Sequence, residues 1–377
     1  MKPERYLLAS FLLLAASACS PAENVEGLSD APGDSAFSAI SLPDGFAIHL
    51  YAEVPNARSM VRTPDGTLFV GTRNGGTVYA VRDDDGDHRA DAVHVIDEGL
   101  QLPNGVAFRD GSLFVAEVSR ILRYDDIEAR LANPPEPVVV ADDFPTETHH
   151  GWKYIAFGPD GKLYVPVGAP CNICDDGLPF AAIHRMNADG TGREVVAEGV
   201  RNTVGFDWDP RTGDLWFTDN GRDQLGDNLP PCELNHLSEV GQHFGYPYIH
   251  GASLNDPEFG EGHDPASYRA PAQELGPHVA PLGMEFYEGG NFPAEYQGQI
   301  FIAEHGSWNR SQKIGYRVSL VRLNAAGEPI AYETFAEGWL EGQENWGRPV
   351  DLEHLPDGSL LLSDDQGGRI YRIVYTG

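Results

Sequence analysis

A short phrase that recurs six times constrains this chain more than any other feature. The phrase is a tight turn ending in glycine followed by an apolar run, as in Pro-Asp-Gly-Thr-Leu-Phe-Val at residues 64–70 and Pro-Asp-Gly-Lys-Leu-Tyr-Val at residues 159–165. Its glycines are Gly66, Gly111, Gly161, Gly213, Gly298 and Gly358. The first three intervals are 45, 50 and 52 residues, close to the ~40 to 50 residues of a four-stranded propeller blade. We therefore predict an all-β, six-bladed β-propeller over residues 39–377, with an insertion in the longest interval of 85 residues.

The sequence of the glycine turns also predicts their turn type. Asp-Gly is a preferred pair for type I′ turns, in which both central residues take positive φ, so each phrase is predicted to close a hairpin of this type between two strands of a blade. Helical periodicity is nearly absent, and residues 127–131 are the one short candidate. Functional residues are expected in loops at one end of the central channel, because propellers place their sites there.

The first twenty residues have the pattern of an export signal. Lys2 and Arg5 precede an apolar run from Tyr6 to Ala16, and small residues lead to Cys19. Residues 1–18 are predicted to be a signal peptide, Cys19 to be lipidated as in bacterial lipoproteins, and residues 19–38 to be a polar tether. This predicts a protein on the periplasmic face of a bacterial membrane, and Ser20 after the cysteine favours the outer membrane. The alternative is ordinary cleavage and a secreted soluble protein.

The overall charge excludes one class of partner. Asp and Glu outnumber Lys and Arg by 57 to 26, a formal net charge of −31. Such a chain repels nucleic acid phosphates and anionic lipid surfaces, so neither is an expected partner. The acidity is consistent with solubility or with the steering of a basic protein partner.

Two polar pairs stand just before glycine phrases, where loops enter blades. His149 and His150 precede the third phrase, and Arg201 and Asn202 precede the fourth. A histidine there is a candidate general base, because its ordinary pKa near ~6.5 lets it accept a proton at neutral pH. Arginine and asparagine suit a carboxylate and a carbonyl, but all four residues also fit the simpler interpretation of hydrogen-bonded loop side chains.

Two acidic segments could bind Ca²⁺ through oxygen ligands. One runs from Asp219 to Asp223, with Asp227 and Glu233 nearby, and the other from Asp83 to Asp91. The glycine of the second segment is misplaced for an EF-hand, and in so acidic a chain either segment could be a solvated turn.

The cysteines after Cys19 are Cys171, Cys174 and Cys232. The C-x-x-C pair in an exported chain favours a local disulfide over half of a zinc site, because no second such pair exists. Cys232 is then free, or it competes for one of the two. No nucleophile-elbow, P-loop or dinucleotide fingerprint is present, so serine hydrolase, NTPase and nicotinamide chemistry lack support.

Several of these features together resemble a known family. The carriers are Leu-Pro-Asp-Gly-Phe at residues 42–46, His150 with the Gly-Pro-Asp-Gly turn at 158–161, the Arg201–Asn202 pair and Glu-His-Gly-Ser-Trp-Asn-Arg-Ser at 304–311. This ordered set, over about residues 40–375, is similar to the soluble quinoprotein sugar dehydrogenases, and nearest to their sorbosone dehydrogenase-like branch. Members are six-bladed propellers that use pyrroloquinoline quinone (PQQ) and Ca²⁺.

The resemblance implies specific roles. His150, eight residues before Gly158, corresponds to the general base that takes the hydroxyl proton of the sugar. Arg201 and Asn202 correspond to the pair that holds the cofactor and faces the reacting centre. The main-chain carbonyls of Gly221 and Arg222 correspond to the ligands of the cofactor-side Ca²⁺.

Further cofactor contacts are implied at Arg73, Gln101, His278, His305 and Arg348. PQQ carries three carboxylates, so several arginines at one mouth would suit it in an otherwise acidic protein. The physiological electron acceptor is expected to be a cytochrome or a quinone.

The chain also departs from the family pattern. It has His305 where glucose-oxidising members have Lys, His278 where they have Thr, Val350 where they have a second Arg, and Arg222 where relatives have Pro. Two other functions therefore stay open: a propeller that binds a ligand without catalysis, and a calcium-dependent lactonase with Glu, Asn and Asp side chains on a central metal.

Overall fold

The computed structural model describes residues 37–377. The predicted signal peptide, Cys19 and nearly all of the predicted tether lie outside these residues. Among the residues described, no helix is long and apolar enough to cross a membrane.

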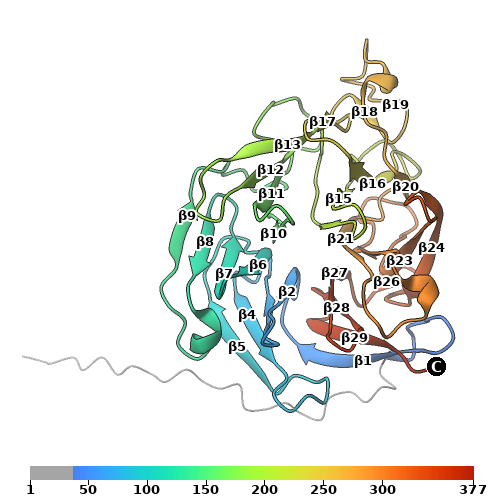
Figure 1. Ribbon diagram of the computed structural model, residues 1–377. Coiled ribbons are helices and arrows are strands. Elements are labelled where there is room, and N and C mark those ends of the chain that lie inside the picture. The colour runs from blue at the N-terminus through green and yellow to red at the C-terminus, as the bar shows by residue number, and fades with distance from the viewer. Residues whose placement is uncertain (1–36) are drawn as a thin grey trace, which may run out of the picture.

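The described chain forms six antiparallel blades around a common centre, so the predicted six-bladed propeller is confirmed (Figure 1). The first three blades in chain order are built from β2 (Met60–Arg62), β3 (Leu68–Val70), β4 (Val78–Arg82) and β5 (Ala92–Asp97), then β6 (Gly105–Arg109), β7 (Ser112–Ala116), β8 (Ile121–Tyr124) and β9 (Val138–Ala141), then β10 (Ala156–Phe157), β11 (Leu163–Val167), β12 (Ala182–Met186) and β13 (Glu194–Glu198). The remaining blades are built from β14 (Phe206–Trp208), β15 (Leu215–Asp219), β16 (Cys232–Leu237) and β20 (Gln273–Leu275), then β21 (Pro281–Phe286), β22 (Ile300–Glu304), β23 (Arg317–Leu323) and β24 (Pro329–Glu337), then β27 (Pro349–His354), β28 (Leu360–Asp364), β29 (Arg369–Tyr375) and β1 (Phe46–Glu53).

The last blade takes strands from both ends of the chain. β1 pairs antiparallel with β29, in a register that puts Phe46 opposite Tyr375, and β27 and β28 complete the sheet. The ring is therefore closed by main-chain hydrogen bonds between its first and last strands.

Apolar side chains from neighbouring sheets fill the spaces between blades. Phe69 and Val78 of one blade pack in one cluster with Val115 and Leu122 of the next, and all four are buried. Burying an apolar side chain of this size contributes ~1.5–3 kcal/mol, so each blade is stabilised chiefly by its neighbours.

The six glycine phrases each connect the inner strand of a blade to its second strand, as predicted. The predicted type I′ turn is wrong for five of them, because only Asp110–Gly111 has positive φ at both residues. At Gly66, Gly161 and Gly358 the glycine alone is left-handed and its N–H bonds the carbonyl three residues earlier. Each of these three phrases carries proline two positions before the glycine, so proline and aspartate are the central residues of the observed turn and the glycine follows them. Proline fixes φ near ~−65°, which suits the first central position of a type I or II turn.

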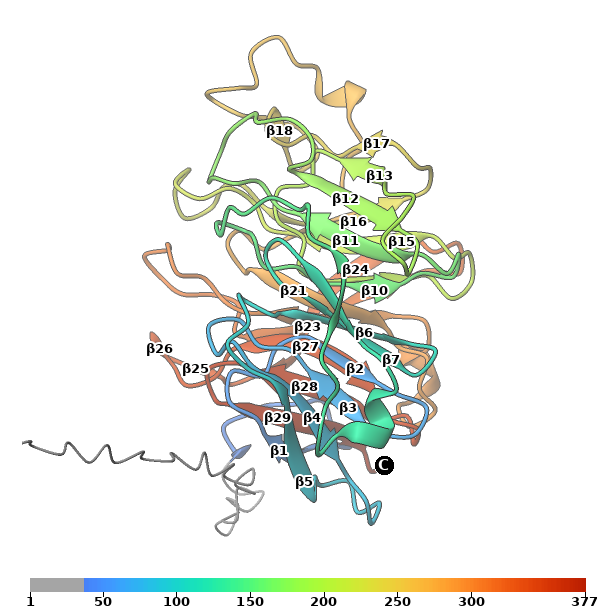
Figure 2. The same cartoon turned by 90° about the vertical axis from the view of Figure 1, so that its left-hand side faces the viewer.

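The predicted insertion leaves the blade between β16 and β20. It contains β17 (Gln242–His243), which adds parallel to β13, the hairpin of β18 (Ile249–His250) and β19 (Leu254–Asn255), and the 3₁₀ helix η3 (Pro265–Ser267). It projects from one side of the ring (Figures 1 and 2). The short helical candidate at 127–131 is a 3₁₀ helix, η2 (Ile127–Arg130), and the sequence did not indicate η3 or η4 (Ala294–Tyr296). A second small hairpin, β25 (Leu340–Glu341) with β26 (Glu344–Asn345), precedes β27.

The blade topology sorts the loops onto two ends of the ring. The glycine phrases join first to second strands and so lie at one end. Loops that join second to third strands, or one blade to the next, lie at the other end. Every site residue predicted within the propeller belongs to a loop of this second kind.

Candidate active site

His150 sits in the loop between β9 and β10. Its ring is buried and its Nδ1 lies 2.8 Å from the carbonyl oxygen of Ala169. Because a carbonyl only accepts, Nδ1 carries the proton and Nε2 keeps its lone pair. Burial, and then the charge of Arg201, hold the pKa of His150 well below 6.5. His150 is therefore a neutral base at neutral pH, with Nε2 free of any hydrogen bond within the residues described.

Two glycines and a lysine keep the His150 loop in place. A Cβ on Gly168 would lie 2.6 Å from the Cβ of His150, so this close approach requires glycine. A Cβ on Gly151 would lie 2.2 Å from the carbonyl oxygen of Glu147. Nζ of the buried Lys153 donates to the carbonyls of Gly151, at 3.0 Å, and of Val118, at 2.6 Å in the neighbouring blade. Burial lowers the pKa of Lys153 to about 8.

His149 is exposed and lies next to His150, with ring centroids 4.1 Å apart and the ring planes tilted by 57°. Burial and Arg201 also lower its pKa. Within the part of the chain that the structure describes, no hydrogen bond of its ring orients His149, so His150 is the better-placed base of the two.

Arg201 and Asn202 are fixed through their main chain by Asp219, at the end of β15. Their N–H groups donate to the two carboxylate oxygens of Asp219, at 2.8 and 2.6 Å. Four bonds hold the buried Arg201 guanidinium: Nε to the carbonyl of Asn172, Nη2 to its Oδ1, and Nη1 to the carbonyls of Asn220 and Gly221. In this arrangement four of the five N–H donors of Arg201 serve the protein.

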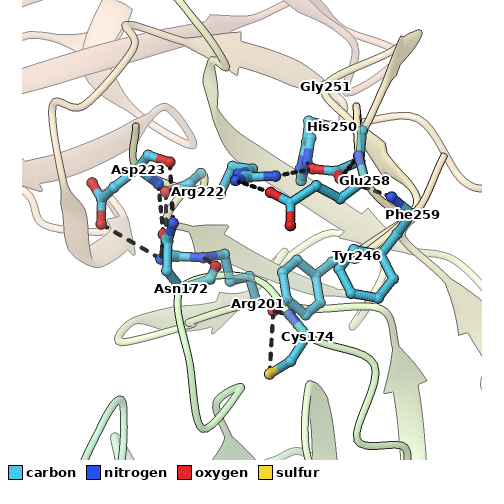
Figure 3. Close-up of polar contacts among 12 residues, drawn as sticks. Asn172, Cys174, Arg201, Arg222, Asp223, Tyr246, His250, Gly251, Glu258 and Phe259 are labelled. Atoms are coloured by element: carbon cyan, nitrogen blue, oxygen red, sulfur yellow. Dashed lines mark hydrogen bonds and ion pairs between the residues drawn. The ribbon is translucent and has the colours of Figure 1, made fainter. Parts of the chain in front are cut away.

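The predicted metal ligands Gly221 and Arg222 follow β15. The carbonyl of Gly221 accepts the bond from Arg201, 3.0 Å long, which leaves one of its two lone pairs. The side chain of Arg222 turns the other way and pairs with Asp256, at 2.5 Å, and Glu258, at 3.0 Å (Figure 3).

A buried acidic pair lies beside this segment. Asp219 and Glu233 line a cavity of about 10 Å³ together with Gly221 and Arg201, a space for one water or ion. Burial, and for Glu233 also the charge of Asp219, raise the pKa of Asp219 to about 6 and that of Glu233 to about 8. Carbonyl and carboxylate oxygens are the donors that Ca²⁺ prefers, so this donor set fits the predicted ion.

A second cluster gathers cations around Asp365, in the loop after β28. Its oxygens pair with Arg58 at 2.6 Å, Arg348 at 2.9 Å and His305 at 3.0 Å. These partners hold the pKa of Asp365 far below its ordinary range despite burial. Burial lowers the pKa of His305. Two arginines on one carboxylate leave a net positive site in an acidic protein.

Arg73 joins this cluster to the histidine. Its guanidinium lies over the ring of Trp152, 3.6 Å from the centroid, and Trp152 packs edge-on to His150 at 6.1 Å. Burial and the neighbouring Arg58 lower the pKa of Arg73 to about 10. The Nε of Arg73 and the Nε1 of Trp152 are buried donors with no hydrogen-bond partner among residues 37–377.

A planar polyanion could accept hydrogen bonds from these two unused donors. Val204, Leu282 and Val350 form an apolar floor against Trp152. Val350, in place of a family arginine, is part of this floor. Arginine donors above an apolar and aromatic floor fit the carboxylates and ring of the predicted quinone.

His278 and Gln101 make contacts outside the clusters around His150 and Asp365. Nε2 of His278 lies 2.8 Å from the carbonyl of Gly226, and its Nδ1 lies 3.9 Å from Asp223, which the amide of Asn309 also contacts. Gln101 is exposed, and its N–H donates to Glu117 at 2.7 Å. Both are at the predicted end of the ring, without direct contact to His150.

The structure also describes the cysteines and the acidic segment from Asp83 to Asp91. Cys171 and Cys174 form the expected local disulfide, and Cys232 is free and buried. Carboxylate oxygens of Asp83, Asp85 and Asp91 lie within 4.8 Å of one another on an exposed loop.

Sequence reasoning missed Arg58, Asp365 and Asn172. Arg58 precedes β2 much as Arg201 precedes β14 and Arg348 precedes β27, so its position before an inner strand was a usable signal. Nothing in the sequence distinguishes Asp365 or Asn172 from other polar loop residues.

Comparison with known proteins assigns the family. The family profile described as "Domain of unknown function (DUF7133)" matches residues 33–375, and the chain belongs to that family. An uncharacterized protein of Borreliella burgdorferi is 32% identical over 356 residues, which cover 90% of this chain and 91% of that protein. A pyrroloquinoline quinone-dependent pyranose dehydrogenase of Coprinopsis cinerea is 31% identical over 277 residues, covering 57% of this chain and 36% of that protein.

Solved structures share the fold. The PQQ domain of the Coprinopsis cinerea pyranose dehydrogenase in its holo form has a TM-score of 0.75 at 19% identity, covering 89% of this chain and 97% of that one. The PQQ-bound aldose sugar dehydrogenase of Streptomyces coelicolor has a TM-score of 0.63 at 21% identity, covering 89% and 99%. At these identities the likeness establishes the six-bladed architecture.

Proposed function

We propose that this protein is an oxidoreductase that uses PQQ and Ca²⁺ to oxidise a sugar, either an aldose or a sorbosone-like sugar. One observation carries the proposal: His150, a neutral base with a free Nε2, is joined through Trp152 to Arg73, whose buried Nε has no partner. A proton acceptor, His150, and an anion-binding group, Arg73, thus lie at the same end of the ring. The quinone-dependent relatives support the same function.

The chemistry of each side chain or carbonyl indicates whether it would bind the cofactor or the metal. Arg73 and Arg348 would pair with the carboxylates of the quinone, with Gln101, His278 and His305 as further contacts. Arg348 is 39% exposed and keeps Nη donors free for this. The carbonyls of Gly221 and Arg222 would hold Ca²⁺, with the carboxyl oxygens of Asp219 and Glu233 nearby.

The bound cofactor would supply the redox chemistry by accepting a hydride from the sugar carbon, with Ca²⁺ as Lewis acid. The protein supplies the proton transfer. Nε2 of His150 accepts the hydroxyl proton of the sugar while Nδ1–H stays bonded to Ala169, which holds the ring in one tautomer. Arg201 and Asn202 are the proposed pair at the reacting centre, their main chain fixed by Asp219.

Reconstitution tests the proposal directly. Purified protein is loaded with PQQ and CaCl₂ and assayed for dye reduction with a panel of aldoses and sorbosone, with and without a calcium chelator. We expect sugar-dependent reduction that the chelator abolishes and added Ca²⁺ restores. Binding of the quinone without dye reduction by any sugar would favour the non-catalytic propeller.

A lactonase requires Glu, Asn and Asp side chains on a central metal. Among residues 37–377, the groups of three His, Cys, Asp or Glu side chains close enough to share a metal are Asp83–Asp85–Asp91 and Cys171–Cys174–Asp176, both on loops with exposed members. No observation here favours the lactonase, and lactone hydrolysis without the quinone would be the result that revives it.

We also propose that Cys19 is lipidated and anchors the protein to a bacterial membrane, facing the periplasm. The pattern of the first twenty residues supports this proposal. A membrane-held dehydrogenase would pass its electrons to a cytochrome or a quinone.

A further inference from the structure

The disulfide-closed loop 171–174 lies against the Arg201 site. It is part of the connection from β11 to β12, residues 168–181, and the Cys171–Cys174 disulfide closes it. It is also held from the insertion, because the hydroxyl oxygen of the buried Tyr246 accepts the N–H of Cys174 at 3.0 Å and lies 3.7 Å from the sulfur of Cys171. The loop between the two cysteines is therefore fixed from two sides.

Asn172 is the residue that this loop presents to the site. Its carbonyl accepts Nε of Arg201 at 2.8 Å, and its Oδ1 accepts Nη2 of Arg201 at 2.9 Å. The same Oδ1 accepts the N–H of Asp223 at 2.8 Å, and Nδ2 donates to the carbonyl of Asp223 at 3.1 Å (Figure 3). One side chain thus joins the arginine to the segment that follows β15.

Arg201 in turn holds the residues that follow β15. Its Nη1 donates to the carbonyls of Asn220 and Gly221, both at 3.0 Å. Asn172 and Arg201 therefore grip residues 220–223 at three carbonyls and one N–H. This segment carries Gly221 and Arg222, the proposed metal ligands. Hydrogen bonds to a buried charge are among the stronger ones, so the grip is stiff.

We propose that Asn172 is a positioning residue: held by the Cys171–Cys174 disulfide, it sets Arg201 and residues 220–223 in the geometry that binds Ca²⁺ and the quinone. The inference rests on the proposed function. It adds a determinant of cofactor loading on a loop that does not itself supply a metal ligand.

Hydrogen exchange tests the positioning without any cofactor. In Asn172→Ala, the amide of Asp223 loses its acceptor and should exchange faster. The amides of Arg201 and Asn202 keep Asp219 as acceptor and should exchange as in the wild type. Asn228→Ala is the matched control, because Asn228 is exposed on the loop between β15 and β16 that also carries Asp223. Unchanged exchange at Asp223 in Asn172→Ala would overturn the proposal.

Cofactor affinity tests the consequence. PQQ is titrated in excess CaCl₂ and followed by the quenching of tryptophan fluorescence. Loss of bonds to a charged group should weaken the binding of PQQ by about tenfold or more in Asn172→Ala. Asn172→Asp keeps the oxygen acceptor and should recover part of that loss. Asn228→Ala should bind within about twofold of the wild type.

The paired change Cys171→Ser and Cys174→Ser tests the disulfide and serves if Asn172→Ala does not fold. It should also weaken PQQ binding, and raise exchange at Asp223, while the amide of Arg201 stays protected. Equal PQQ affinity in the wild type, Asn172→Ala and the paired serine variant would overturn the proposal. A wild type that binds no PQQ would instead refute the proposed function, and the exchange result would still decide the role of Asn172.

Discussion

Nδ1 of His150 donates a hydrogen bond to the carbonyl oxygen of Ala169, 2.8 Å away. Ala169 is itself bonded through its N–H to the carbonyl of Arg201, at 2.8 Å. The proposed base and the arginine that follows β13 are thus connected through one residue of the loop after β11. This link sets the tautomer of His150 and places its free nitrogen, and the first predictions test it.

Removing the imidazole should remove the proton acceptor while leaving the anion site intact. For His150→Ala we expect kcat to fall by ~10² or more, the usual effect of losing a general base, with PQQ affinity within a few-fold. Steady-state dye reduction and PQQ titration measure the two quantities. His149→Ala is the control and should retain most of its turnover. Near-normal turnover in His150→Ala with loss in His149→Ala would transfer the role to His149.

The pH profile of kcat should show its acid limb below pH 6.5. A base acts in its neutral form, and burial holds the pKa of His150 well below 6.5. Activity should therefore stay constant as the pH falls from neutral to 6.5 and decline only at lower pH. The measurement is kcat against pH at saturating sugar. An acid limb centred at or above pH 6.5 would contradict the assignment.

The glycine behind the base should resist substitution. In Gly168→Ala the new Cβ would meet the Cβ of His150 at 2.6 Å, so the histidine must shift. A displacement of this kind costs ~10² in kcat, and overpacking costs ~1–3 kcal/mol of stability. Gly290→Ala, where nothing lies within 4 Å, should leave both quantities unchanged. Wild-type turnover in Gly168→Ala would show that this contact does not place the base.

Asp365 should stabilise the fold as well as order the cation cluster. Asp365→Asn leaves the guanidinium of Arg58, 2% exposed, without its carboxylate, and breaking a buried pair costs ~3–5 kcal/mol. Asp125→Asn removes the exposed pair with Arg123 and should cost at most ~1 kcal/mol. Urea unfolding at neutral pH measures both. The folded pKa of Asp365 is depressed, so its contribution is present above the ordinary carboxyl pKa and the difference from Asp365→Asn should shrink in acid. A loss that does not depend on pH would contradict this account.

The export pattern predicts where the protein sits. Wild-type protein expressed in a bacterial host should fractionate with membranes, and Cys19→Ser should be soluble or unprocessed. Mass spectrometry of the mature N-terminus checks the modification. An unmodified Cys19, or cleavage at another residue, would indicate a freely soluble secreted protein.

The sequence predicted the ring because each blade repeats its own local signal. A glycine that needs positive φ and the apolar strand after it are both visible in the chain. The turn type was wrong where Pro64, Pro159 and Pro356 stand two positions before the glycine, because proline, with its fixed negative φ, takes the first central position and the turn forms one residue earlier than Asp-Gly.

The candidate site was predicted in part. His150, Arg201 and Arg348 stand at loop positions that the repeat makes recognisable. Asp365 and Asn172 act through partners up to 307 residues away in sequence, as Asp365 does with Arg58. Contacts of that range arise only when the ring closes, and no pattern along the chain encodes them.

Ring closure also sets an order of events during biosynthesis. β1 is the first strand of the described residues, and its partner β29 is made after the strands of all the other blades. Until β29 has been made, β1 exposes an unpaired strand edge that any other extended segment can join. A chain of this topology therefore needs that edge to stay unfolded or shielded until β29 is available. A frameshift that removes only the final strand would leave five complete blades and no closed protein.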